Sequence, residues 1–335
     1  MKNTAILISL LFLFSCGNKT PQKFVNQGEA FGTTYSIQTY SLENLSLEKG
    51  IDSVIYVVNK SVSIYLPKSD ISKINRGDTS IVVDNIFIDN FNISAEVHKN
   101  TQGYFDPTIG VLRNAYGFGD TKPLKQIDSL TLDSLLQYVG FNKVKLTDEN
   151  KIVKQHPEIY FDFNAVAKGY GIDQIGNYLE SKGISNYLIE LGGEILAKGK
   201  NLEKNKPWIV GIENVDSQLE DRSYSSIVSL KNEAMAASGN YRKFRIDSLT
   251  GKKYVHTLNP ITGSAEKSDV TSATVIASTC AMADAYATAF MALGLEKSKE
   301  VLKTLNGIEA YLTYNDQNNK EQVFVTEGFK SHLLD

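Results

Sequence analysis

Residues 186–199 read NYLIELGGEILAKG: an apolar run, two adjacent glycines and a second apolar run. This pattern predicts a strand, a tight turn and another strand, because glycine adopts the left-handed backbone conformations that short hairpins need. Two strands joined by so short a turn pair antiparallel. The stretch therefore predicts an antiparallel hairpin.

The residues just before the hairpin predict a helix. Residues 158–184, EIYFDFNAVAKGYGIDQIGNYLESKGI, change from an apolar run ending near Asp162 to a helical spacing of Ile172, Ile175 and Leu179. We expect a strand, a turn and a helix that opens over 165–168 and ends at Lys182-Gly183.

Strands and helices are mixed along the rest of the chain. Ser69 is expected to cap a short helix that begins near Asp70. Strands are predicted at 28–40, 207–214, 226–230, 234–239, 253–263 (running into a turn) and 271–278, hairpins at 143–153 and in the last thirty residues, and helices at 44–60, 86–102, 131–139, 280–294 and 296–305. This mixture predicts an α+β fold with largely antiparallel sheets and packed helices, in a single domain over 28–335.

The first residues predict export and a lipid anchor. Lys2 precedes the apolar run AILISLLFLF (5–14), which is too short to span a bilayer and is typical of a secretory signal over 1–15. It ends in LFSC, the pattern of a bacterial lipobox, which predicts cleavage before Cys16 and acylation of that cysteine. The alternative is an ordinary cleavage site beside a chance cysteine. Residues 16–27 are then a lipidated polar tether, and the protein is extracytoplasmic, most simply on the periplasmic side of the inner membrane.

The composition excludes some classes of function. The formal net charge is −3, and the loss of Lys2 with the signal makes it −4. Without a basic stripe, the chain has no feature of a nucleic-acid-binding protein. With Cys16 acylated, Cys280 is the one remaining cysteine, so no disulfide forms within the mature chain and Cys280 is expected in the core.

The segment DFNAVAKGYGID (162–173) is a candidate anion site. A helix that starts near Ala165 presents unpaired N–H groups and the positive end of its dipole to a phosphate. Lys168 adds a mobile cation, and the glycines allow close approach. Their spacing matches neither a Walker loop nor a Rossmann fingerprint. The alternative is a tight strand-to-helix packing turn.

Two further clusters have an open interpretation. His256 in YVHTLNPITG (254–263) follows a predicted strand and precedes an Asn-Pro turn, where a histidine is either catalytic or structural. In GYFDPTIGVLRNAYGFG (103–119), four aromatic residues either wall a flat ring system or form a small aromatic core: Tyr104, Phe105, Tyr116 and Phe118.

The helix segment AMADAYAT (281–288) holds a carboxylate without a neighbouring cation. Asp284 and Thr288 stand four residues apart, so they share one helix face. Their oxygens suit a hard cation such as Mg²⁺, which binds together with substrate phosphates. The alternative is an exposed polar face or a cap.

The four clusters together resemble the FAD:protein FMN transferases, the ApbE-like flavin transferases. The resemblance covers nearly the whole mature chain. It rests on FGTTYSI, SIYLPKSDISKIN, FDPTIGVLRNAYGFG, DFNAVAKGYGIDQI, LIELGGEI, ASGNYRKF, HTLNPITG and ADAYATAFMALG, in that order. It implies an enzyme that cleaves the diphosphate of FAD with the help of Mg²⁺, joins FMN to a Thr or Ser hydroxyl of an acceptor flavoprotein, and releases AMP.

The resemblance also implies roles for individual residues. The Mg²⁺ ligands would be the Asp284 carboxylate, the Thr288 hydroxyl and the Ala165 carbonyl, and His256 would be the general base. The expected FAD contacts are Phe31, Tyr65, Tyr104, Phe105, Asp106, Asp162, Lys168 and Leu258.

The chain departs from the family pattern at two positions. Phe31 stands where the family often has Met, and Asn164 stands where it usually has Gly. Asn164 is expected to narrow the entry to the helix or to change its hydrogen bonds. Two alternatives to transfer remain open: an FAD pyrophosphatase that yields FMN and AMP, and an FAD-binding lipoprotein without turnover.

Overall fold

The computed structural model describes residues 20–214, 223–240, 244–246, 253–265 and 268–334. Within these residues the largest sheet has eight strands, in the order β1-β2-β5-β6-β9-β12-β13-β14, and every neighbouring pair is antiparallel. Its strands are β1 (Gln22–Ala30), β2 (Thr33–Ser41), β5 (Tyr187–Leu191), β6 (Glu194–Lys198), β9 (Glu233–Gly239), β12 (Val270–Ala277), β13 (Glu309–Asn315) and β14 (Glu321–Val325). The predicted α+β class is confirmed. The predicted Gly-Gly hairpin forms the β5–β6 pair of this sheet.

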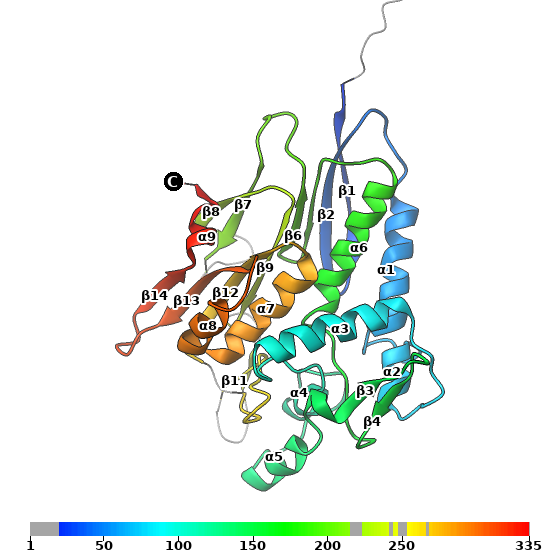
Figure 1. The fold of residues 1–335 in the computed structure, drawn as a ribbon, viewed down its shortest axis with the longest axis vertical. Helices are drawn as coiled ribbons and strands as arrows, with labels where there is room; N and C mark the ends of the chain where they lie inside the picture. Colours follow the sequence, from blue (N-terminus) through cyan, green and yellow to red (C-terminus); the bar gives the residue numbers. More distant parts are fainter. Residues whose placement is uncertain (1–19, 215–222, 241–243, 247–252, 266–267, 335) are drawn as a thin grey trace, which may run out of the picture.

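Helices cover one face of this sheet (Figure 1). They are α1 (Glu48–Val62), α3 (Asn85–Asn100), α6 (Ala167–Ser181) and α7 (Cys280–Leu293). Side chains alternate between the two faces of a strand, so Ile189 and Leu191 of β5 pack with α6, while Leu188 packs on the other side. The helices α6 and α7 pack against each other and against the middle of the sheet.

A smaller sheet covers the opposite face. It consists of β7 (Trp208–Glu213), β8 (Tyr224–Leu230) and β15 (Leu333–Leu334), and the short helix α9 (Glu327–Lys330) lies beside it. The fully buried Trp208 fills this layer, and its indole N–H donates to the carbonyl of Lys198 at 2.8 Å. The main sheet is therefore covered on both faces and lies between two apolar layers.

Short elements extend the helical side (Figure 1). They are α2 (Asp70–Asn75), α4 (Gly110–Tyr116), α5 (Ser129–Leu136), the 3₁₀ turn η1 (Phe141–Lys143), β3 (Val144–Leu146), β4 (Ile152–Lys154), β10 (Phe244–Ile246), β11 (Lys253–Val255) and α8 (Leu295–Leu302). Ser69 caps α2 by accepting a hydrogen bond from the N–H of Ser72, as predicted.

Two local expectations were wrong. The strand predicted at 28–40 is a hairpin, because the chain turns at Phe31 and Gly32, both with positive φ, and β1 begins at Gln22, inside the expected tether. The strand expected before Asp162 is reduced to a single bridge between Ile109 and Tyr160, because this segment lies on α4 instead of in a sheet.

The signal segment over 1–15 and Cys16 lie outside the described residues. In the part of the chain that is described, no helix has the length and apolar character that crossing a membrane requires.

Candidate active site

The N-terminal ends of α6 and α7 meet at Gly169 and Asp284. The backbone N–H of Gly169 donates to Asp284 Oδ2 at 3.1 Å. A Cβ at position 169 would lie 2.4 Å from the carbonyl oxygen of Cys280, so only glycine lets the two helices approach this closely. The contact places a carboxylate of α7 at the N-terminal end of α6.

A second carboxylate fixes the same junction. Asp173 of α6 accepts hydrogen bonds from the N–H groups of Cys280, at 2.8 Å, and Ala281, at 2.9 Å. These N–H groups begin α7 and have no partner inside their own helix, so Asp173 caps α7 from a neighbouring element. Burial raises the pKa of Asp173 to about 6, although both hydrogen bonds act in the opposite direction.

The junction contains more buried negative than positive charge. Asp284 is 5% exposed, which rules out the exposed-face interpretation. Lys168, in the first turn of α6, pairs with Glu194 of β6 at 2.6 Å, so it is not the mobile cation we expected. Burial raises the pKa values of Asp284 and Glu194 against the effect of Lys168. Burial alone would lower the pKa of Lys168, but Glu194 and Asp284 overcome this and raise it.

The three predicted metal ligands provide a suitable donor set for Mg²⁺. Thr288, one turn after Asp284 on α7, is half-buried, and its hydroxyl lies 3.2 Å from that of Ser238 on β9. Ala165 precedes α6 by two residues. Among the described residues no three His, Cys, Asp or Glu side chains form a metal cluster. Mg²⁺ commonly binds one or two carboxylates together with substrate phosphates. The carboxylates of Asp284 and Glu194 face a single lysine, Lys168, which leaves one buried negative charge for a cation to balance. The residues therefore fit this ion.

Asp162 and Tyr65 are joined through Asn164. Asp162 is buried, pairs with the Arg113 guanidinium at 2.7 Å, and accepts a hydrogen bond from the N–H of Asn164 at 2.8 Å. The Asn164 amide donates to the Tyr65 hydroxyl at 3.3 Å, and Tyr65 is 57% exposed. Asn164 thus adds a hydrogen bond that a glycine at this position would have no side chain to make.

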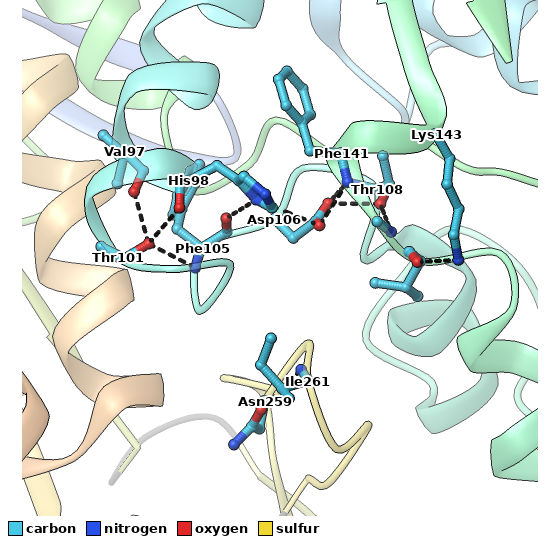
Figure 2. A network of polar contacts seen from close by, with 12 residues as sticks. Val97, His98, Thr101, Phe105, Asp106, Thr108, Phe141, Lys143, Asn259 and Ile261 are labelled. Carbon is cyan, nitrogen blue, oxygen red and sulfur yellow. Dashed lines mark hydrogen bonds and ion pairs between the residues drawn. The ribbon is translucent and has the colours of Figure 1, made fainter.

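The loop after α3 is organised by Asp106 (Figure 2). Its carboxylate accepts hydrogen bonds from the N–H and hydroxyl of Thr108, at 2.8 and 2.6 Å, and from the N–H of Phe141 at 2.9 Å. His98 Nδ1 lies 3.5 Å from the same carboxylate. Burial raises the pKa of Asp106, and Thr108 and His98 oppose the rise. Asp106 is therefore a turn-forming residue, whatever else it binds.

The aromatic residues of this loop differ in accessibility. The rings of Phe105 and Tyr116 are buried, which favours the aromatic-core interpretation for these two. Tyr104 is half-buried, and its ring lies 4.4 Å from Lys297 Nζ. Phe31, in the β1–β2 turn, contacts α6 at Gly171, where a Cβ would lie 2.5 Å from its ring.

His256 directly follows β11 and begins a turn. In this turn the Asn259 carboxamide accepts hydrogen bonds from the N–H groups of Ile261 and Thr262, and Leu258 is buried against α4. Figure 2 shows Asn259 and Ile261 across a gap from the Asp106 network. The gap is a cavity of about 430 Å³ lined by residues of α3, the Gly103–Asp106 stretch, the α5–η1 segment and this turn.

Glu194, Arg113 and Asp173 were missed by the sequence analysis. Glu194 stood in the quoted hairpin, directly after Gly-Gly, where a charged residue opens an otherwise apolar strand. Arg113 and Asp173 stood inside quoted motifs as unremarkable polar helix residues. Only their partners, from other elements, give them a role at the site.

Comparisons with known proteins agree with the motifs. The profile described as the ApbE family matches residues 31–312. The FAD:protein FMN transferase of Haemophilus influenzae is 33% identical, over 95% of this chain and 92% of that protein. The FAD:protein FMN transferase of Vibrio cholerae is 31% identical over 99% of both chains.

Solved structures have the same fold. The flavin transferase ApbE from Vibrio cholerae superposes with a TM-score of 0.83 at 29% identity, over 93% of this chain and all of that one. The ApbE protein of Thermotoga maritima superposes with a TM-score of 0.81 at 24% identity, over 94% of this chain and all of that one. The chain therefore belongs to the ApbE family.

Proposed function

We propose that this protein is an FAD:protein FMN transferase. The observation that carries the proposal is the junction of α6 and α7, where the buried Asp284 carboxylate lies at a helix N-terminus next to Lys168 and Glu194. The relatives of 31–33% identity over nearly the whole chain are named for this activity. We further propose that Asp284, Thr288 and the Ala165 carbonyl hold Mg²⁺.

The diphosphate of FAD would bind at the start of α6. Val166, the N-cap of this helix, makes no side-chain capping bond. The N–H groups of Ala167 and Gly169 already donate to the Phe163 carbonyl and to Asp284, so the anion would be attracted by the positive end of the helix dipole. Lys168 adds a charged donor. Mg²⁺, when bound, neutralises charge that develops on the departing AMP phosphate. Asp162, Tyr65 and Phe31 are expected to hold the flavin part, where an exposed tyrosine offers a ring for stacking.

Transfer would then be a single displacement at phosphorus. The hydroxyl oxygen of an acceptor Thr or Ser bonds to the phosphorus of the FMN half, and the bond to the AMP phosphate breaks. His256 takes the hydroxyl proton, a task for which an imidazole is suited near neutral pH. Most of the rate gain in such a reaction comes from positioning and charge neutralisation.

We also propose that Cys16 carries the lipid that anchors the protein outside the cytoplasm, on the periplasmic side of the inner membrane. The lipobox LFSC supports this, and β1 begins at Gln22, only six residues after Cys16. A short tether would keep the active site close to acceptor flavoproteins in the same membrane.

The decisive experiment incubates the purified protein with FAD, Mg²⁺ and an acceptor flavoprotein domain that contains the Thr or Ser motif. We expect flavin fluorescence on the acceptor in a denaturing gel, AMP release, and loss of both with His256→Ala. AMP and FMN without acceptor labelling would favour the pyrophosphatase. FAD that stays intact in excess Mg²⁺ would favour a binding protein. Full labelling by His256→Ala would refute the role of the histidine.

A further inference from the structure

Glu194 is a buried charge at the junction to which the reaction above gives no task. It is the first residue of β6, directly after the Gly192-Gly193 turn. Side chains alternate along β6: Ile195 packs on the small-sheet side and Leu196 on the helix side, so Glu194 shares the helix side with Leu196. The strand therefore aims this carboxylate at the start of α6.

Glu194 and Lys168 differ in exposure. The Glu194 side chain is 4% exposed and that of Lys168 is 27% exposed, and their charged atoms lie 2.6 Å apart. The carboxylate is thus enclosed by protein, while the lysine still reaches solvent. An ammonium has three donors, so one bond to Glu194 leaves two for oxygens of a ligand.

A buried ion pair by itself contributes little to the stability of a fold. Removing two charges from water costs several kcal/mol per ion, and apolar side chains of similar size often stabilise a core at least as well. The pair also stands beside Asp284, whose carboxylate adds a second negative charge near the same lysine. The arrangement is explained better by a requirement for one fixed ammonium position.

We propose that Glu194 is a positioning residue: it holds the Lys168 ammonium so that its free N–H donors point toward the FAD diphosphate beside Asp284. This inference rests on the proposed function. In this role Glu194 would touch neither substrate nor Mg²⁺. Its effect reaches the reaction only through Lys168, the one described cation with which the structure records an ion pair.

The test compares Glu194→Gln, Glu194→Ala, Lys168→Ala and the double variant Lys168→Ala/Glu194→Ala. Glu190→Gln is the matched control, since Glu190 lies in the same hairpin but binds the Gly193 N–H instead of a lysine. Folding is checked by melting temperature. FAD affinity is measured by flavin fluorescence in EDTA, where no turnover occurs, and kcat is measured by FMN transfer to the acceptor.

We expect kcat to fall about fivefold in Glu194→Gln, whose neutral amide oxygen still accepts a weaker bond, and at least about fiftyfold in Glu194→Ala. FAD affinity should stay within about threefold, because the freed ammonium keeps its charge. The double variant should be no slower than Lys168→Ala, because the two side chains act as one unit. Glu190→Gln should match the wild type.

An additional readout does not depend on activity. Acylation of Lys168, followed by mass spectrometry, should be at least threefold faster in Glu194→Ala than in the wild type, because the ion pair holds the amine against Glu194 and away from the reagent. Unchanged acylation, unchanged kcat in Glu194→Ala, or kcat losses that multiply in the double variant would each overturn the inference. A wild type that neither labels acceptor nor releases AMP refutes the proposed function instead, and with it this role of Glu194.

Discussion

Asp284 Oδ2 accepts a hydrogen bond from the backbone N–H of Gly169 at 3.1 Å, across 115 residues of sequence. This bond joins the N-terminal ends of α6 and α7. It brings the carboxylate proposed as a Mg²⁺ ligand to the helix end proposed to bind phosphate. The chemistry that we assign to the protein depends on this junction.

Replacing Asp284 by Asn should abolish transfer without unfolding the protein. We expect kcat to fall at least about 100-fold, because the neutral amide neither balances the charge of Mg²⁺ nor binds the ion firmly. The melting temperature should stay or rise, since a buried charge is removed. Acceptor labelling over a Mg²⁺ titration, together with thermal melts, checks both outcomes.

Thr288, the neighbouring proposed Mg²⁺ ligand, offers a matched pair of variants for the same experiment. Thr288→Ser keeps a hydroxyl and should retain most activity, whereas Thr288→Val has nearly the same shape without it and should require more Mg²⁺. Full FAD turnover by Asp284→Asn, or equal Mg²⁺ requirements for the two Thr288 variants, would mean that the metal assignment is wrong.

Gly169→Ala should destabilise the protein more than Gly171→Ala. The new Cβ at 169 meets backbone, the Cys280 carbonyl at 2.4 Å, and we expect a loss of about 1–3 kcal/mol in the free energy of unfolding. A new Cβ at position 171 meets the Phe31 ring, a side chain that can turn aside. Alanine is also favoured over glycine inside a helix by about 1 kcal/mol. Urea denaturation of both variants measures the difference. An equal loss at both positions would contradict the backbone contact.

Asp173 should make stability depend on pH between about 4 and 6. Its folded pKa is raised to about 6 from a usual value of 3.8, so the unfolded chain ionises first as pH rises. The stability contributed by the protonated form is present below pH 4 and is lost as pH rises through 6, by about 2–3 kcal/mol.

Comparison with Asp173→Asn isolates this effect from that of other carboxylates. The unfolding free energy of the wild type minus that of Asp173→Asn should decrease as pH rises from 4 to 7. Denaturation at four pH values within this range measures the trend. A difference that is constant with pH would show that Asp173 has the same pKa in both states.

Cys16→Ser should release the protein from membranes. Cleavage before Cys16 and acylation require the thiol, and several acyl chains on one residue anchor a protein stably. Fractionation of cells and labelling with a fatty acid such as palmitate check the result, with Cys280→Ser as the control because Cys280 is fully buried. Wild-type protein without label would refute the lipoprotein proposal.

Local features of the fold were predictable from the sequence. The Gly-Gly hairpin, the Ser69 cap and the helical spacing of α6 follow from backbone preferences and from apolar residues on one face. The errors were local too: the β1–β2 turn uses a phenylalanine with positive φ, a conformation that sequence signals seldom reveal. Motif order identified the family and named Asp284, Thr288 and Lys168 as candidates.

Tertiary structure alone decided how those candidates are arranged. The sequence placed Asp284 on a helix but left its exposure open, and it gave Lys168 a free charge. Folding buried Asp284 against Gly169 and committed Lys168 to Glu194. The physical reason is that periodicity reports which face of an element is apolar, whereas contacts between distant elements depend on how closely their backbones pack. Here the missing Cβ of Gly169 sets that distance, and with it the buried charges of the site.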